Sequence, residues 1–451
     1  MNCSRLTQAI SSSEGMSQIF SSVNTVQRML DVEAALAKAL AAEGVIPQAS
    51  VPVIAEACVV ANIDLERLAR DAGNAGNLAI PLVKQLTARV AARDAEAARH
   101  VHWGATSQDV IDTGLVLQLR EALQLIMVEL AELADALANV AHRHRSTLVM
   151  GRTWMQHALP ITFGLKAAGW LDAVMRHQDR ISLIAKRVAV LQFGGASGSL
   201  ASLGDQGLTV AHALAHQLQL ELPAVPWHGH RDRVAEVATT LGLLTGTLGK
   251  IARDISLQMQ TEIAEVSEPI SHGRGGSSTM PHKRNPVGCA AVLAAAARVP
   301  AQISTMLSAI VQEHERALGG WQAEWDTLPQ IAELTGAALT QLRTVIEGLQ
   351  VDQARMRANI DLTQGLVMAE AVSLALGRHL GRAAAHELVE SACAEALRTS
   401  ATLQEVLRAD SRVMQHLSNE SLAQLFDPAH YLGEALAFTD RVLAAHRQRK
   451  A

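Results

Sequence analysis

The sequence has 451 residues, of which 49% are apolar and 18% are charged, and its formal net charge at pH 7 is -5. This length predicts two or three domains, and the small negative charge gives no reason to expect nucleic acid or an anionic membrane as a partner. Four scattered cysteines without a CxxC pair indicate neither a disulfide framework nor a zinc ribbon. Because the sequence has neither a signal-peptide pattern nor an uninterrupted apolar run of about 18 residues, it predicts a cytoplasmic protein.

Ala and Leu recur at intervals of three and four residues almost throughout, which predicts a nearly all-α chain. Shorter helices, interrupted by "EGVIPQASVP" and "RDAGNAGNLAIP", are expected to form an N-terminal domain over residues 1–110. A central domain of long helices is expected over residues 111–355, and a small helical domain over residues 356–451. The chain shows no internal repeat and no low-complexity tract.

Three long helices are expected in the central region, over residues 108–145, 231–266 and 286–312. Each is apolar on most of its circumference, and such a helix must be buried on several sides. The stretch "AVLAAAARVPAQISTMLSAIV" at 291–311 is rich in small residues that permit close helix approach. We therefore expect a long bundle that continues across subunits into an oligomer.

The first polar stretch, "VHWGATSQD" at 101–109, precedes the first long helix. The hydroxyls of Thr106 and Ser107 lie where helix N-terminal N–H groups are free, and such a terminus binds anions. A simple N-cap is the alternative interpretation. His102, taken alone, is more often a surface or hydrogen-bonded histidine than a catalyst.

The second polar stretch is "MGRTWMQHALPITFG" at 150–164. We expect it to be a polar loop before a helix that starts near Pro160. Its polar side chains include Arg152, Gln156 and His157.

The third stretch, "FGGASGSLASLGDQG" at 193–207, has no lysine after its glycines and no strand before them. It therefore fails the context of a P-loop or a dinucleotide fingerprint. A loop shaped for close packing or for ligand approach is what remains.

The fourth stretch is "GRGGSSTMPHKRNP" at 273–286. No Asp or Glu occurs between Glu268 and Glu313, whereas four Lys and Arg residues do, and this charge pattern favours an anionic ligand. The alternative is a mobile basic surface loop. The polar candidates on this loop are Ser277, Ser278, Lys283 and Asn285.

Metal sites are weakly indicated. His212 and His216 are four residues apart but lack the glutamate of HExxH, and His228 and His230 stand beside a Pro-Trp turn. We interpret both pairs as solvated or structural histidines and predict no metal site.

The loop sequence "GSSTMPHKRNP" resembles the signature GSSxMPxKxNP of the fumarase/aspartase superfamily at every fixed position. "TSQD", "GRT" with "HALPITFG", and "HRDRVAE" follow the order and spacing of the family, so the resemblance covers essentially the whole chain. It implies a three-domain, nearly all-α homotetramer in which each active site is built from three subunits. It also implies cofactor-free addition or elimination across a carbon–carbon bond next to a carboxylate.

The resemblance implies roles for individual residues. Ser277 matches the acid/base, and Lys283 and Asn285 match the groups that hold the substrate carboxylate. Thr106 and Ser107 match a second carboxylate-binding site. Two histidines are further catalytic candidates: His102, which matches a site histidine of the adenylosuccinate lyase branch, and His157, which could replace Ser277 as the acid/base. The remaining substrate-binding candidates are Arg152, Trp154, Gln156 and Ser278.

Two departures from that branch bear on the substrate. Trp154 stands where many of these lyases carry histidine, and a leaving carboxylate, with a conjugate acid of pKa about 4, needs no general acid. Ile10 and Ser11 replace an Arg-Tyr pair, and Trp321 and Trp325 follow "HER" in place of the branch's serines and arginine, so the contacts for a nucleotide phosphate are missing.

The stretches "QRMLDVEAALAKA" and "GGASGSLASLG" and the variant "GRTW" resemble a cycloisomerase branch of aromatic-acid catabolism. The resemblance implies that a carboxylate of a small tricarboxylate substrate adds to its own double bond. Adenylosuccinate lyase and ammonia lyase activities on the same scaffold are the alternative enzymes. A non-catalytic helical scaffold is the alternative of another class.

Overall fold

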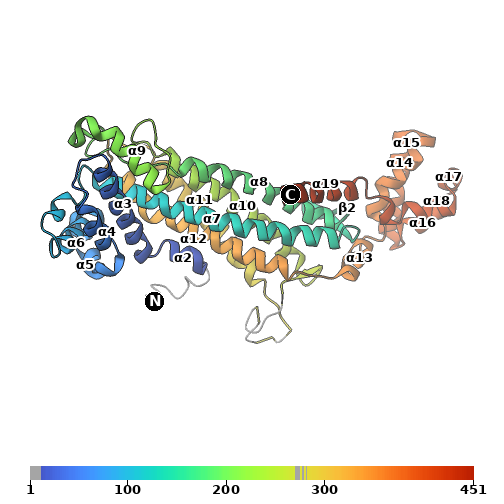
Figure 1. Ribbon diagram of the computed structural model, residues 1–451. Helices are drawn as coiled ribbons and strands as arrows, with labels where there is room; N and C mark the ends of the chain where they lie inside the picture. Colours follow the sequence, from blue (N-terminus) through green and yellow to red (C-terminus); the bar gives the residue numbers. More distant parts are fainter. Residues whose placement is uncertain (1–11, 270–274, 277–278, 281, 451) are drawn as a thin grey trace. The chain divides into compact units, whose positions relative to one another are not determined.

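The computed structural model describes residues 12–269, 275–276, 279–280 and 282–450. Helices dominate these residues, and the only strands within them form two short antiparallel pairs (Figure 1). The prediction of a nearly all-α chain is confirmed.

The chain divides into two compact units. The first comprises residues 1–130, 177–249 and 291–340, and the second comprises residues 131–176, 250–290 and 341–451. Five long helices each contribute residues to both units: α7 (Ser107–Arg143), α8 (Phe163–Val188), α10 (Asp232–Gln258), α11 (Val287–Ser308) and α12 (Gly320–Glu347).

The shorter helices of the first unit precede α7 or follow α8. The longest of them, α3, begins after Ser21, whose hydroxyl accepts a hydrogen bond from the N–H of Asn24, and it has no glycine or proline along its 21 residues. One face of α3 is fully buried and carries Glu33 among alanines and leucines. The helices are α2 (Glu14–Ile19), α3 (Ser22–Ala42), α4 (Ser50–Ala57), α5 (Leu65–Ala75), α6 (Ala79–Ala91) and α9 (Gly207–Leu218).

Within the first unit, α10 packs closely against α11 and α12. A Cβ added to Gly242 of α10 would come within 2.0 Å of Ile303 on α11, so this approach requires a glycine. On the other contact, the hydroxyls of Thr245 and Thr335 lie 2.8 Å apart. The expected bundle of long helices is therefore present (Figure 1).

Two of the three expected long helices match α7 and α11 to within four residues at each end. The third is shorter than expected, because α10 ends at Gln258 rather than near residue 266. The N–H groups of Ile263 and Ala264 turn back to the carbonyl of Gln260, and Ala264 adopts a left-handed conformation with φ 50°. The short strand β3 (Val266–Ser267) follows and pairs with β4 (Gln350–Val351).

The expectation of a polar loop at 150–164 is wrong. Residues there form an antiparallel hairpin of β1 (Leu148–Thr153) and β2 (Gln156–Thr162), and α8 begins only at Phe163. The reason is local: the alternation of the strands extends over few residues, and the turn uses Trp154 and Met155 in place of the Asn and Gly that usually announce such a hairpin.

Most C-terminal helices of the second unit enclose a small core of their own, which includes Val372, Leu376, Leu403 and Leu407. The last helix instead binds α7 through the ion pair of Lys450 with Asp135, and the residues just after α7 through the pair of Asp440 with Arg145. The C-terminal helices of the second unit are α13 (Gln353–Asp361), α14 (Ala369–Leu380), α15 (Arg382–Thr399), α16 (Leu403–Ala409), α17 (Ser411–Met414), α18 (Asn419–Leu425) and α19 (Ala435–Lys450). The expected domain boundaries at residues 110 and 355 stay a prediction.

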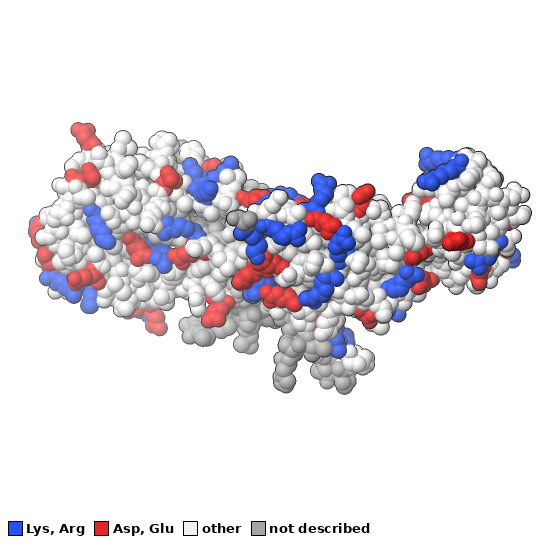
Figure 2. Space-filling model, turned by 45° about the vertical axis from the view of Figure 1, so that its right-hand side comes forward, with Lys and Arg blue, Asp and Glu red and all other residues white. Residues whose placement is uncertain are grey.

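One helix of the described ranges, α11, is long and apolar enough to cross a membrane by length and composition. Only 28% of its most apolar window is buried within this chain. Elsewhere on the surface, acidic and basic side chains are interspersed on the face shown in Figure 2. By contrast, a single chain leaves most of the apolar surface of α11 uncovered.

Candidate active site

The turn before α7 brings together three predicted site residues, His102, Thr106 and Ser107, in the first unit. The backbone turns sharply here, since His102 has φ 59° and Gly104 has φ 80°. A left-handed conformation at a residue other than glycine is held only where the surroundings determine it.

A buried carboxylate determines the position of the His102 ring. Nδ1 of His102 lies 2.6 Å from Oε1 of Glu33, whose side chain is 1% exposed, against 19% for His102. Burial of the ring opposes its charge. The attraction of Glu33, the hydrogen bond to it and the charge of Asp109 outweigh burial, and they raise the pKa of His102 above its usual value.

Asp109 fixes the first turn of α7 against the glycine-rich third stretch. Its carboxylate accepts hydrogen bonds from the N–H groups of Thr106 (2.9 Å), Gly194 (3.0 Å) and Gly195 (2.9 Å), and lies 2.7 Å from Nε2 of His228. The N–H groups of Gly194 and Gly195 thus hold the start of this stretch against α7, and His228 is a structural histidine. The N–H of Thr106 is not free, contrary to our expectation.

Arg316, which we had not predicted as a site residue, binds the hydroxyls of this turn. Its guanidinium donates to Oγ1 of Thr106 at 2.7 Å, to Oγ of Ser107 at 3.3 Å and to Oε1 of Gln108 at 3.3 Å. The positive charge beside the two hydroxyls comes from this side chain. A fixed guanidinium with two hydroxyls is suited to bind a carboxylate.

The start of α7 rests on a fully buried ion cluster. Arg231 donates to both oxygens of Asp112 (2.7 and 3.0 Å) and to both oxygens of Glu324, with a shortest contact of 2.6 Å. Trp321 donates to Asp112 at 2.9 Å, and the Trp227 ring lies 4.9 Å from the guanidinium carbon. These contacts tie α7, α10 and α12 together beneath the site.

The hairpin of the second unit carries Arg152, but a buried carboxylate already occupies this guanidinium. Arg152 donates to both oxygens of Glu265, at 2.6 and 3.0 Å, and Glu265 is 0% exposed. Gln258 and Asn359 donate to the same carboxylate. Arg152 therefore anchors the hairpin, and its predicted contact with substrate stays a prediction.

The tip of this hairpin presents Trp154 and Met155 to solvent. Trp154 is 97% exposed and Met155 73%, and both have positive φ, 51° and 65°. Left-handed conformations of this kind cost of order 1–2 kcal/mol per residue, and large apolar side chains are rarely left fully exposed. The tip thus has the properties of a contact surface.

Gln156 and His157 follow the tip on β2, opposite Thr153 and Arg152. Burial and the nearby charge of Arg152 lower the pKa of His157, although Glu265 opposes this effect. His157 is therefore neutral near pH 7 and able to accept a proton.

The structure describes only part of the fourth stretch, and the predicted site residues Ser277 and Ser278 lie outside the described residues. Lys283 is exposed, and the N–H of Asn285 donates to the carbonyl of Gly275 at 2.9 Å. Gly275 has φ 71°, and a Cβ there would lie 2.8 Å from the carbonyl oxygen of Asn285, so the loop needs a glycine at this crossing.

The helix that follows this loop does not offer all its N-terminal donors to a ligand. The buried carboxylate of Glu268 accepts the N–H groups of Gly288 at 3.0 Å and Cys289 at 2.8 Å. In this part of the chain, the capacity to bind anions therefore depends on side chains such as Lys283.

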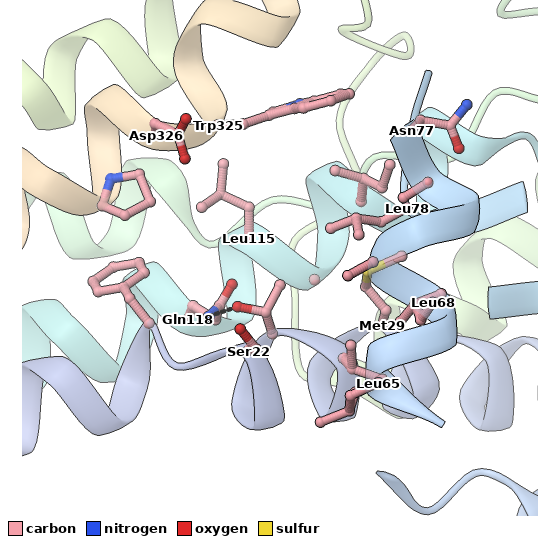
Figure 3. A pocket seen from close by; sticks show the side chains of 18 of the residues that line it. Ser22, Met29, Leu65, Leu68, Asn77, Leu78, Leu115, Gln118, Trp325 and Asp326 are labelled. Carbon is pink, nitrogen blue, oxygen red and sulfur yellow. Dashed lines mark hydrogen bonds between the residues drawn. The ribbon is translucent and has the colours of Figure 1, made fainter. Parts of the chain in front are cut away.

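A cavity of about 670 Å³ opens elsewhere in the first unit, between α3, α5, α7 and α12 (Figure 3). Apolar side chains such as Met29 and Leu115 line it, and its charged residues are Asp326 and Glu333. Burial raises the pKa of Glu333. None of the predicted site residues lines this cavity, and its acidic wall does not suit a substrate with several carboxylates.

Known proteins resemble this chain along most of its length. A model of the lyase family, described as "Lyase", matches residues 9–301, and one described as "Adenylosuccinate lyase C-terminus" matches residues 365–442. The chain is 55% identical to a 3-carboxy-cis,cis-muconate cycloisomerase of Pseudomonas aeruginosa, over 96% of this chain and 94% of that protein.

Two solved structures are similar along nearly the whole chain. One is the 3-carboxy-cis,cis-muconate lactonizing enzyme of Pseudomonas putida, with 52% identity and a TM-score of 0.95, covering 99% of this chain and 100% of that one. The other is the β-carboxy-cis,cis-muconate cycloisomerase of Acinetobacter calcoaceticus, with 46% identity and a TM-score of 0.93, covering 98% and 100%.

Proposed function

We infer the function from one premise: the chain belongs to the lyase family, whose model matches residues 9–301. The chain is an enzyme that converts 3-carboxy-cis,cis-muconate to the lactone 4-carboxymuconolactone. The observation that carries this function is the 55% identity with the Pseudomonas aeruginosa cycloisomerase over almost the full length of both chains. An adenylosuccinate lyase or ammonia lyase activity receives no comparable support.

The reaction joins two parts of one molecule and takes up one proton. A carboxylate oxygen of the substrate forms a C–O bond to one carbon of a double bond, and the electron pair moves to the neighbouring carbon. That carbon bears a carboxylate, into which the charge spreads, and it then takes a proton from a donor group, which recovers one from water. The substrate trianion thus becomes the lactone dianion, and the step needs no oxidant, reductant or co-substrate.

We assign the stabilisation of charge to fixed donors around the substrate carboxylates. Lys283 and Asn285 hold the carboxylate that becomes the dianion, and Ser277 delivers the proton. Arg316 extends this assignment: with Thr106 and Ser107 it binds a second carboxylate, supported by its 2.7 Å contact with the hydroxyl of Thr106. His157, which is neutral near pH 7, is the alternative proton carrier.

Trp154 fits this chemistry because a carboxylate leaves without a proton in the reverse direction. A tryptophan at the exposed tip of the hairpin supplies apolar wall where a general acid is not needed. Its exposure in a single chain, together with that of Met155, supports insertion of the tip into a site on another copy.

We propose a homotetramer whose active sites combine residues from three subunits. The apolar surface of α11 supports this assembly, since a core helix of an oligomer needs no other cover. In this proposal α11 is a helix of a shared bundle in a cytoplasmic enzyme, and it spans no membrane.

The test of the function is a comparison of three substrates with the purified protein. Ultraviolet absorbance follows 3-carboxy-cis,cis-muconate, adenylosuccinate and aspartate side by side. We expect turnover of carboxymuconate with kcat/KM at least about 10⁴ M⁻¹s⁻¹, and none of the other two within detection. Turnover of adenylosuccinate or release of ammonia would replace this function, and inactivity toward all three would favour a structural role.

A further inference from the structure

We propose that Glu33 is a positioning residue for this reaction: its buried carboxylate binds Nδ1 of His102, fixes the ring and its positive charge, and leaves the Nε2–H to donate to a carboxylate of the substrate. The inference rests on the proposed function for the identity of that substrate. The pairing of Glu33 with His102 was not predicted from the sequence.

The geometry makes the two ring nitrogens unequal. Nδ1 faces inward to Glu33 at 2.6 Å, and no residue in the described ranges binds Nε2. The carboxylate cannot turn toward solvent, because its side chain is 1% exposed on the buried face of α3. An ion pair with one buried and one partly exposed member directs the free N–H outward.

The conformation of His102 supports this role. The residue is held at φ 59° immediately before the turn that presents Thr106 and Ser107. A histidine that only filled space would adopt an ordinary conformation, because a left-handed one is strained. The strained backbone and the ion pair together fix a cationic donor in the segment that leads into Thr106 and Ser107, the two hydroxyls that Arg316 binds.

Two carboxylates favour the charged ring. Glu33 approaches from α3, and Asp109, which also binds His228, adds negative charge from the first turn of α7. The cation nearby in the fold is Arg316, which comes from the segment between α11 and α12 and binds the hydroxyls of Thr106 and Ser107. On α3 the Glu33 carboxylate also acts on Cys58, whose pKa is raised first by burial and then by this charge.

The test compares Glu33→Gln with wild type across pH 6 to 10. Glutamine keeps the shape and a hydrogen bond but removes the charge, so the pKa of His102 should fall. We expect kcat/KM at pH 8 to drop about 10-fold to 100-fold, as for loss of a charged hydrogen bond, and the alkaline limb of the profile to move to lower pH. The matched control is Asp31→Asn, a charge-removing change on the same helix, which should leave the limb in place.

A second comparison separates positioning from folding. In a His102→Asn background, Glu33→Gln should lower kcat/KM less than about 3-fold further, because both residues act through one ring. Full additivity of the two losses, or an unmoved alkaline limb in Glu33→Gln, would overturn the proposal.

Binding of propane-1,2,3-tricarboxylate, which cannot react, tests Glu33 independently of turnover. Its Kd is measured by calorimetry over the same pH range. As the pH rises, affinity should be lost at a lower pH in Glu33→Gln than in wild type. The same Kd profile in both proteins would contradict the role of Glu33, whereas a shifted profile without carboxymuconate turnover would reject only the proposed function.

Discussion

Ser277→Ala is expected to lower kcat for carboxymuconate by about 10²-fold to 10⁴-fold, the usual contribution of a general acid or base. Without the hydroxyl, the carbanion formed by C–O bond formation has no proton donor at hand. KM should change little, because the carboxylates of the substrate bind to other residues. Steady-state kinetics followed in the ultraviolet measure both quantities.

Arg316→Ala provides the contrast to Ser277→Ala. It removes a carboxylate-binding cation and leaves the proton carrier, so KM should rise more than kcat falls. Size-exclusion chromatography should show the same assembly for both variants and for wild type. Near-normal turnover by Ser277→Ala would mean that Ser277 does not deliver the proton and that His157 is the proton carrier.

Arg231→Met is expected to be the most destabilising single change in the first unit. It leaves Asp112 and Glu324 buried without their shared cation, and breaking a buried ion pair in this way costs about 3–5 kcal/mol. We expect a Tm lower by several degrees, measured by calorimetry or circular dichroism. The loss should also loosen the start of α7, since the cluster joins that helix to α10 and α12.

Arg187→Met is the matched control for Arg231→Met. Arg187 pairs with Glu236 at the surface, where the two side chains are 54% and 43% exposed. Exposed pairs of this kind contribute about 0–1 kcal/mol, so its Tm should stay close to that of wild type. Equal losses from the two variants would mean that the buried cluster does not stabilise the fold.

The sequence predicted the helical class and the long helices because their apolar periodicity extends over many turns. It did not predict the hairpin of β1 and β2, where few residues alternate and the turn residues Trp154 and Met155 are unusual for their conformation. The end of α10 was also missed, since Ala264, which turns the chain there, is ordinarily a helix former.

Candidate site residues could be proposed from the sequence where a motif lies in one stretch of chain. His102, Thr106 and Ser107 belong to a single turn, and the loop before α11 contains Lys283 and Asn285. Partners that return from distant positions gave no local signal: Glu33 and Arg316 reach this turn from 69 and 210 residues away. Only the fold brings them to the same place.

The central claim is that a carboxylate of the substrate adds to its own double bond and that a solvent-exchanging group then protonates the neighbouring carbon. Conversion of 3-carboxy-cis,cis-muconate in D₂O, followed by nuclear magnetic resonance of the product, tests this claim most directly. We predict a γ-lactone with one deuterium on the carbon next to a carboxylate. A product that is not a lactone, or a lactone without deuterium at that carbon, would contradict the account.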